Sequence, residues 1–155
     1  MDSLLHTPEG VRDIYNEECS KKNALSAKLD RILKLYGYKD IQTPTFEFFD
    51  IFNRERGSVP SRNMYKFIDR DGSTLVLRPD ITPSIARAVA KYFKEETIPL
   101  RFSYCGNTFI NNSSLQGKMK ETTQLGAELI GDRDIEGDAE VVALAIHLVL
   151  ESGLT

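Results

Sequence analysis

The first long periodic segment of the chain lies between residues 16 and 36. Its apolar residues recur every three or four positions, which places them on one face of an α-helix. Asn16 is of a type that caps helix N-termini, and Gly37 can take the left-handed conformation that ends a helix. The pattern therefore predicts a helix here, with an apolar face formed by Leu25, Leu29, Ile32, Leu33 and Tyr36.

Shorter runs of strand type follow this helix. A strand is expected from Tyr38 to Thr43, where Pro44 ends it, and a hairpin is expected from Met64–Ile68 and Ser73–Arg78. Gly72 can adopt the positive φ that the hairpin turn needs. The phenylalanines between strand and hairpin favour a core or a subunit interface over a ligand site, because they bury large areas without polar demands. They are Phe46, Phe48, Phe49 and Phe52.

The second half of the chain predicts a helix, a pair of strands and a final helix. Thr82 should open the first helix as its N-cap, with Pro83 at the first helical position, and this helix should end at about Lys94. Strands at about 100–110 and 119–130 are joined by a polar loop from Asn111 to Lys120, and the last helix covers about 138–152. The helix that begins at Thr82 should bury Ile85, Ala88, Val89 and Tyr92.

Consecutive strands flanked by helices predict an α+β domain with an antiparallel sheet covered by helices. The length of 155 residues is typical of one globular domain with a single core. The final helix is apolar on most sides between Val141 and Leu150, so part of its surface needs a further packing partner. Either the domain dimerises or the chain is the N-terminal part of a longer protein.

Composition and charge exclude several classes of function. The net charge of -3 gives no global electrostatic reason to bind nucleic acid, and no run approaches the ~18 apolar residues of a membrane span. The N-terminus lacks the apolar segment of a secretion signal, so a cytoplasmic protein is expected. Cys19 and Cys105 lack disulfide-framework or zinc-site spacing and are expected to be buried reduced thiols; no metal or cofactor is expected. His147 should pack within the apolar helix, and His6 lies in the N-terminal segment.

Polar side chains gather at the ends of two predicted elements. Asp80 and Thr82 lie where the hairpin passes into the next helix, in L-R-P-D-I-T-P. Gln124 and Glu128 share one face of the last strand with Gly126 between them, while the intervening apolar residues turn to the core. The glycine leaves room for a ligand to approach the backbone. Two carboxylates and an amide suit an ammonium or imidazole ligand, which supplies hydrogen-bond donors; a solvated sheet face is the alternative.

Three segments of the chain resemble the core of the class II aminoacyl-tRNA synthetases, specifically their histidyl branch. They read G-Y-K-D-I-Q-T-P-T-F-E, L-R-P-D-I-T-P and T-Q-L-G-A-E-L-I-G, and the resemblance extends from Thr7 to Asp138. By this resemblance the fold is the class II core. The first segment matches motif 1, a dimer-forming helix and strand, at Gly37, Tyr38, Ile41, Pro44 and Glu47.

The other two segments resemble the family's histidine pocket. Its R-P-E-G-T segment, which helps to hold the amino group of histidine, matches residues 78–82, and its F-H-Q-x-G-x-E segment matches residues 122–128. The resemblance therefore implies histidine-binding roles for Asp80, Thr82, Gln124 and Glu128, with Glu128 as the reader of the imidazole. Asp80 in place of glutamate and Ile81 in place of glycine alter the pocket.

The motif 2 loop departs from the synthetases. Their F-R-x-E carries an arginine that grips the ATP α-phosphate and the amino-acid carboxylate, whereas this chain has Ile110 and Asn112 in F-I-N-N. Lys118 and Lys120 stand where arginines are usual. Adenylation is not expected, because an isoleucine cannot replace a bidentate cation beside a developing phosphoryl charge.

With these departures, the chain resembles a noncatalytic paralogous family, the regulatory subunits of ATP phosphoribosyltransferase, which keep the synthetase fold. R-P-D-I-T-P, and Lys120-Glu121 ahead of Gln124–Glu128, are typical of them. The resemblance implies a short-form catalytic subunit as partner, L-histidine as effector and a homodimer through the motif 1 region. It also implies that residues 1–155 are the N-terminal part of a class II domain, with motifs 1 and 2 and without motif 3.

Two other interpretations stay open. The chain is similar enough to the synthetases to be a fragment of a divergent histidyl-tRNA synthetase catalytic domain, although Ile110 argues against adenylation. The remaining alternative is a synthetase-like interaction or sensor module within a larger protein.

Overall fold

A computed structural model describes residues 5–53, 59–112 and 117–154, and the chain forms two compact units. The hairpin unit comprises Met1–Asp13, Thr43–Lys94 and Gly106–Gln124. The long-helix unit comprises Ile14–Gln42, Glu95–Cys105 and Leu125–Thr155. Each unit has its own cluster of buried side chains, so the expectation of a single core is wrong.

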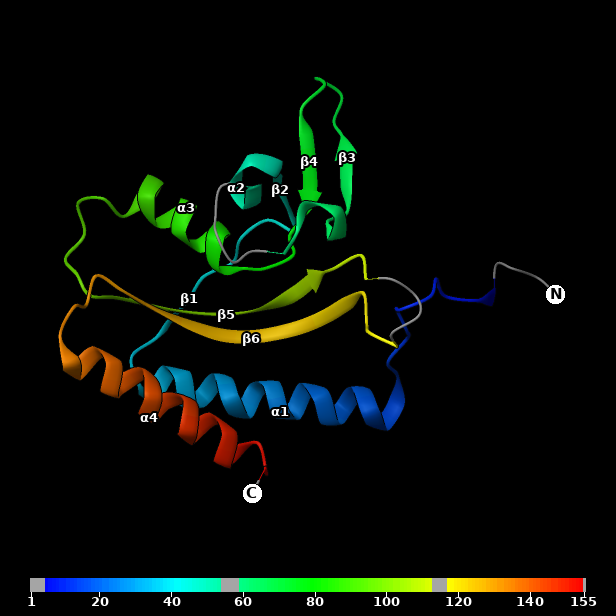
Figure 1. Cartoon of the computed structure of the whole chain (residues 1–155). Coiled ribbons are helices and arrows are strands. Elements are labelled where there is room, and N and C mark those ends of the chain that lie inside the picture. Colours follow the sequence, from blue (N-terminus) through cyan, green and yellow to red (C-terminus); the bar gives the residue numbers. More distant parts are fainter. Residues whose placement is uncertain (1–4, 54–58, 113–116, 155) are drawn as a thin grey trace. The chain divides into compact units, whose positions relative to one another are not determined.

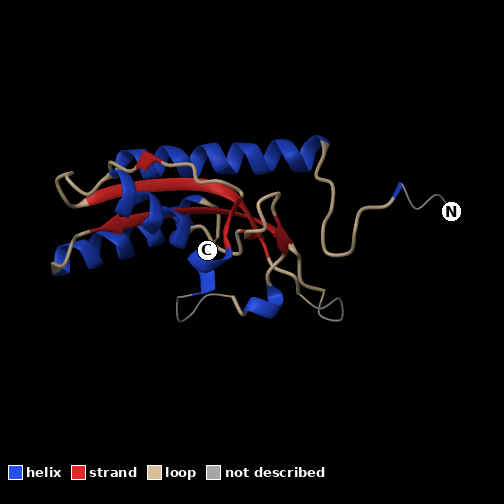
Figure 2. Ribbon diagram, turned by 90° about the horizontal axis from the view of Figure 1, so that it is seen from above, coloured by secondary structure: helices blue, strands red, loops and turns tan. Residues whose placement is uncertain are grey.

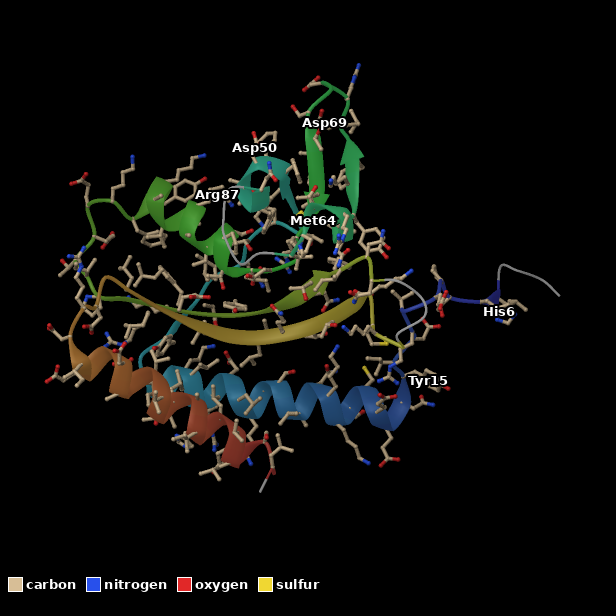
Figure 3. The ribbon with its side chains drawn as sticks, viewed as in Figure 1. His6, Tyr15, Asp50, Met64, Asp69 and Arg87 are labelled. Carbon is tan, nitrogen blue, oxygen red and sulfur yellow. The ribbon has the colours of Figure 1, made fainter. Side chains whose placement is uncertain are left out.

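The hairpin unit contains a three-stranded antiparallel sheet in the order β2-β4-β3 (Figure 1). Its strands are β2 (Phe46–Phe48), β3 (Lys66–Ile68) and β4 (Thr74–Leu77), and the 3-10 helix η2 (Ser61–Asn63) precedes β3. Gly72 has a φ of +83°, and the Asp69 carboxylate accepts hydrogen bonds from the N–H groups of Asp71 and Ser73 at 3.0 and 2.8 Å. Asp69 lies near the end of this hairpin (Figure 3). The predicted hairpin is confirmed.

The core of the hairpin unit contains Phe52, Met64 and Val76. Phe52 belongs to the short helix α2 (Phe49–Asn53) and is fully buried. Phe46 and Phe48, in contrast, expose 53% and 58% of their surface. The core interpretation of the clustered phenylalanines is therefore confirmed for Phe52 and wrong for Phe46 and Phe48 within this chain.

Helix α3 (Thr82–Tyr92) follows β4, and its N-cap position is Ile81. The expectation that the Thr82 hydroxyl caps the helix is wrong. Thr82 already belongs to the helix, whereas the Asp80 Oδ1 atom accepts hydrogen bonds from the N–H groups of Ile81 and Thr82 at 2.6 and 3.3 Å. Ile85 is buried as predicted, but Tyr92 is 65% exposed, and the helix ends at Tyr92 rather than at about Lys94.

Helices α1 (Asn16–Leu35) and α4 (Ile135–Glu151) lie side by side in the long-helix unit (Figure 1). Gly37 has a φ of +83° just beyond α1, as predicted. Tyr15, with extended backbone, occupies the N-cap position in place of the predicted Asn16. Asn16 is wrong as the cap because it belongs to the helix and its φ of 50° is not the extended value that a cap takes.

The second sheet has the order β1-β5-β6, formed by β1 (Lys39–Asp40), β5 (Leu100–Phe109) and β6 (Glu121–Ile130). Strands β5 and β6 run side by side in opposite directions (Figure 1 and Figure 2). Strand β1 pairs with β5 in parallel, so the sheet expected to be antiparallel is mixed. Residues 41–99 separate β1 from β5 in the chain. No tight turn therefore joins the two strands, and nothing requires them to run antiparallel. The boundary between the units falls within β5 and β6.

The long-helix unit buries the inner sides of both helices. Its core residues are at most 3% exposed: Ile32, Leu33, Tyr38 and Leu144. The other side of α4 is open, with Val142, Ile146 and Leu150 exposing 59%, 55% and 62% of their surface. The predicted apolar excess of the final helix is confirmed.

Candidate functional site

Arg78 fixes the segment that carries Asp80 and Thr82. Its side chain is buried and donates hydrogen bonds to three backbone oxygens. The Nε atom lies 2.8 Å from the backbone oxygen of Asn107, and Nη1 lies 2.8 Å from that of Thr43 and 3.4 Å from that of Pro44. Because the arginine joins three segments of the hairpin unit, the start of α3, where Asp80 and Thr82 lie, has a fixed place in that unit.

Gly106 leaves space for the Arg78 guanidinium, and the charge of Glu47 favours its charged form. A Cβ atom on Gly106 would lie 3.2 Å from Arg78 Cζ and closer still to Nη2, so only glycine leaves room for the guanidinium. Burial lowers the pKa of Arg78, and the negative charge of Glu47 opposes that shift. Glu47 is itself buried and accepts hydrogen bonds from Arg87 Nε and Nη2 at 3.1 and 2.6 Å. Arg87 lies on α3 (Figure 3), so the motif 1 glutamate holds this helix.

Strand β6 carries Gln124, Gly126 and Glu128 at every second position, which places them on one face. Leu125 and Ala127 pack against the core of the long-helix unit, which confirms the predicted core side of the strand for these two residues. The four predicted ligand residues form two local pairs, Asp80 with Thr82 at the start of α3 and Gln124 with Glu128 on β6. Asp80, Thr82 and Gln124 belong to the hairpin unit, and Glu128 belongs to the long-helix unit.

The space above Gly126 is occupied by Tyr104, a residue of β5 that the sequence did not single out. A Cβ atom on Gly126 would lie 2.5 Å from Tyr104 Oη and 2.6 Å from Cζ. The expectation that this glycine opens the backbone to a ligand is therefore wrong. The hydroxyl end of the tyrosine ring is the part of Tyr104 that lies nearest to Gly126.

The described ends of the motif 2 loop are joined by backbone and amide hydrogen bonds. Residues 113–116 of the predicted polar loop lie outside the described part of the chain. The Ile110 N–H donates to the Lys120 oxygen at 2.9 Å, and Asn112 Nδ2 donates to the Met119 oxygen at 3.2 Å. Asn112, in place of the synthetase glutamate, thus closes the base of the loop.

Tyr38, Arg101 and Glu140 form a polar cluster that the sequence did not predict. Arg101 donates hydrogen bonds from Nε and Nη2 to the Glu140 carboxylate at 2.8 and 2.6 Å, and Tyr38 Oη donates to the same carboxylate at 3.1 Å. Burial, followed by the Glu140 contact, raises the pKa of Tyr38 to about 12. The hydrogen bond from Arg101 lowers the pKa of Glu140. The cluster joins α4 to β5 within the long-helix unit.

His147 and the two cysteines are the remaining candidate groups from the sequence. His147 Nδ1 lies 3.3 Å from Tyr36 Oη, which confirms that this histidine packs between helices. Both cysteines are free, but Cys19 is half-buried and Cys105 is exposed, so the expectation of burial is wrong. Among the described residues no group of three or more histidine, cysteine or acidic side chains could hold a metal ion. None of the described helices is both long and apolar enough to cross a membrane.

The chain is similar in sequence to several known proteins. The family model of histidyl-tRNA synthetase matches residues 10–155. A protein of Acetivibrio thermocellus named ATP phosphoribosyltransferase regulatory subunit is 45% identical over 150 residues, which are 97% of this chain and 36% of that protein. A protein of the same name from Clostridium novyi is 44% identical over 155 residues, 99% of this chain and 37% of its own length. The chain thus spans little more than a third of these relatives.

Solved structures agree with this result. A Bacillus halodurans protein described as an ATP phosphoribosyltransferase regulatory subunit/histidyl-tRNA synthetase has a TM-score of 0.89 at 36% identity, over 100% of this chain and 40% of its own. Apo histidyl-tRNA synthetase from S. aureus has a TM-score of 0.78 at 30% identity, over 94% of this chain and 34% of its own.

The sheets, the motifs and these structures together define a domain of the class II aminoacyl-tRNA synthetase type. Within that class, the chain belongs to the histidyl-tRNA synthetase family. The predicted similarity to the regulatory subunits of ATP phosphoribosyltransferase is also confirmed.

Proposed function

We propose that this chain is part of a noncatalytic regulatory subunit of ATP phosphoribosyltransferase, acting in the cytoplasm in the first step of histidine biosynthesis. The similarity to the Acetivibrio thermocellus regulatory subunit, 45% identity over 97% of the chain, carries this proposal. The subunit binds and activates the short-form catalytic subunit, and L-histidine acts on the complex as its effector.

The end of β5 supports a role without adenylation. Ile110 follows the last strand residue, Phe109, at the position where the synthetases carry their motif 2 arginine. Its side chain has no hydrogen-bond donor, and the side-chain amide of Asn112, two residues further on, donates a hydrogen bond to the Met119 oxygen. A preorganised bidentate cation beside the α-phosphate typically contributes several kcal/mol to transition-state stabilisation. Without it, this domain is suited to binding an amino acid and not to activating one.

The predicted ligand residues give the effector its site. The resemblance to the synthetases assigns the imidazole of histidine to Glu128 and its amino group to Asp80 and Thr82, and Gln124 lies on the same strand as Glu128. Bound histidine then favours one arrangement of the subunits, and thermodynamic linkage requires the substrates of the catalytic subunit to change histidine affinity in return.

The homodimer forms through the motif 1 region. Phe48, Leu75 and Phe67 are register partners across the sheet of the hairpin unit, so they share one face. Phe46 lies on the same face and meets Phe67 edge-on, with ring centroids 5.9 Å apart. Phe46, Phe48 and Phe67 are all exposed within the chain, and a contact between two subunits would bury them.

The test is reconstitution of the complete protein with a short-form ATP phosphoribosyltransferase. We expect co-purification, a rise in phosphoribosyl transfer and inhibition of the complex by L-histidine. A complete protein that neither binds nor activates such a catalytic subunit would overturn the proposal.

A divergent histidyl-tRNA synthetase is the second candidate, favoured by the family model over residues 10–155 and by the S. aureus structure. It predicts histidine-dependent exchange of pyrophosphate into ATP. Measuring this exchange with the complete protein separates the two candidates, because the regulatory subunit should show none.

A further inference from the structure

A groove of about 550 Å³ lies between α2 and α3 of the hairpin unit. Asp50 on α2 and Arg87 on α3 contribute its charged side chains (Figure 3). The rest of its described lining is apolar and consists of Phe48, Ile51, Pro83, Ala86 and Ala90. None of the described residues that line this α2–α3 groove belongs to the predicted histidine site, so the proposed effector does not explain the groove.

The side of α3 that lines the groove carries short apolar side chains. Pro83, Ala86 and Ala90 are three and four positions apart, so they share one side of the helix. Ala86 and Ala90 are exposed. An exposed helix face usually carries polar residues, whereas short apolar side chains let another apolar surface approach closely. The groove therefore has the chemistry of a contact surface for an amphipathic protein segment.

The charges at the groove are unequal. Arg87 donates hydrogen bonds from Nε and Nη2 to Glu47 Oε1 at 3.1 and 2.6 Å, so its positive charge is offset within the unit. Asp50 is exposed, and no hydrogen bond or ion pair joins it to another described residue. The groove therefore keeps one acidic side chain that attracts a basic partner.

Strand β2 separates the groove side of the sheet from the face proposed for the homodimer. Side chains alternate along β2, so Phe46 and Phe48 point to one face and Glu47 points to the other. Because Glu47 meets Arg87, α3 lies on the face opposite to these phenylalanines. A second subunit that covers Phe46 and Phe67 leaves the α3 wall of the groove accessible, with Phe48 at the boundary. The groove is then available to a different protein.

We propose that the α2–α3 groove docks the short-form catalytic subunit, through an amphipathic segment whose apolar side chains fill the groove and whose basic side chain meets Asp50. This inference rests on the proposed function, because it takes the catalytic subunit as the partner. Helix α3 then carries the docking surface along one side and Thr82 in its first turn. One helix thus connects the predicted histidine site with the catalytic subunit, which gives the coupling between them a physical route.

The test measures binding of the short-form catalytic subunit to the complete protein by calorimetry. Ala86→Trp fills the groove from its exposed α3 wall, and Ala86→Ser is the matched control, because serine keeps the side chain small. Sedimentation velocity of each variant alone reports the homodimer, and thermal unfolding reports the fold.

We expect Ala86→Trp to weaken binding of the catalytic subunit about tenfold or more and Ala86→Ser to leave it unchanged, while the homodimer persists in both. Unchanged binding by a folded Ala86→Trp variant would overturn the inference. Dissociation of the homodimer would also overturn it, because the groove would then belong to the contact between two copies of the chain. Wild-type protein that does not bind the catalytic subunit would overturn the proposed function together with this inference.

Asp50→Lys gives an independent readout, which also serves if Ala86→Trp fails to fold. It should weaken binding about tenfold, because it places a basic side chain opposite the basic residue of the partner. Glu96→Lys makes the same change of charge at an exposed position of the long-helix unit and should leave binding unchanged. Unchanged binding by Asp50→Lys would overturn the inference, and so would equal weakening by both variants, because net charge and not the groove would then govern binding.

Discussion

Arg101 and Glu140 form a bidentate pair between β5 and α4, with Nε 2.8 Å from Oε1 and Nη2 2.6 Å from Oε2. The two residues are 39 positions apart in the chain. Their side chains expose 29% and 23% of their surface, so the pair is only partly screened by solvent. Since Tyr38 donates to the same carboxylate, Glu140 is the centre of the cluster that holds α4.

We therefore expect Glu140→Gln to lower the free energy of unfolding by about 1–2 kcal/mol, because the charge-assisted bonds to Arg101 are lost. The effect should depend on pH. The pKa of Glu140 is lowered below its ordinary 4.5, so the pair stabilises fully above pH 4.5 and its contribution is lost as the pH falls through the folded-state pKa. Urea unfolding as a function of pH measures this. A variant as stable as wild type at neutral pH would contradict it.

Tyr38→Phe tests the same cluster from the alkaline side. The side chain is 2% exposed, and loss of its bond to Glu140 should cost about 1 kcal/mol. The pKa of Tyr38 is raised from 10.0 to about 12, so its neutral form stabilises the fold below pH 10.0, and this contribution is lost as the pH rises through about 12. Wild type should therefore lose more stability than the variant between these pH values. Tyr92→Phe, on the exposed side of α3, should behave as wild type.

The contact between Gly126 and Tyr104 predicts a coupled pair of substitutions. Gly126→Ala places a Cβ 2.5 Å from Tyr104 Oη and should destabilise the fold by about 1–3 kcal/mol. In a Tyr104→Ala background the same substitution should cost at least about 1 kcal/mol less, because the atoms it meets are gone. A double-mutant cycle of unfolding free energies measures the difference. Equal costs in the two backgrounds would show that the ring does not fill this space.

Local chemistry made part of this structure predictable. The turn at Gly72 follows from residues that are adjacent in the chain, and the two faces of β6 follow from its period of two. Cap residues were harder, because the backbone conformation decides which residue takes the N-cap position, and neither helix uses a side-chain hydrogen bond from its cap residue. Tyr15 and Ile81 hold the N-cap positions where Asn16 and Thr82 were expected.

Contacts between distant segments could not be predicted. Arg78 bonds the Thr43 oxygen 35 positions away, and Tyr104 fills the space at Gly126. Neither contact leaves a periodic or spaced pattern, because it depends on the pairing of strands that are far apart in the chain. The glycines give a partial signal: Gly106 and Gly126, both within strands, each accommodate a large side chain.

Glu128→Gln tests the effector site without removing the side chain. The substitution keeps the shape and the accepting oxygen but loses the charge, so the hydrogen bond from the imidazole N–H should weaken. We expect histidine affinity, and with it inhibition of the reconstituted complex, to fall about tenfold or more, while assembly with the catalytic subunit is retained. Glu136→Gln is the matched control, because Glu136 is an exposed residue in the first turn of α4.

Two measurements separate the outcomes of this substitution. Calorimetry reports histidine affinity directly, and the rate of phosphoribosyl transfer at increasing histidine reports inhibition of the complex. Reciprocal coupling requires the two to change together, because an effector inhibits only through its different affinity for the two arrangements of the subunits. Weaker binding with unchanged inhibition would place the effector site away from β6, and unchanged binding would remove Glu128 from it.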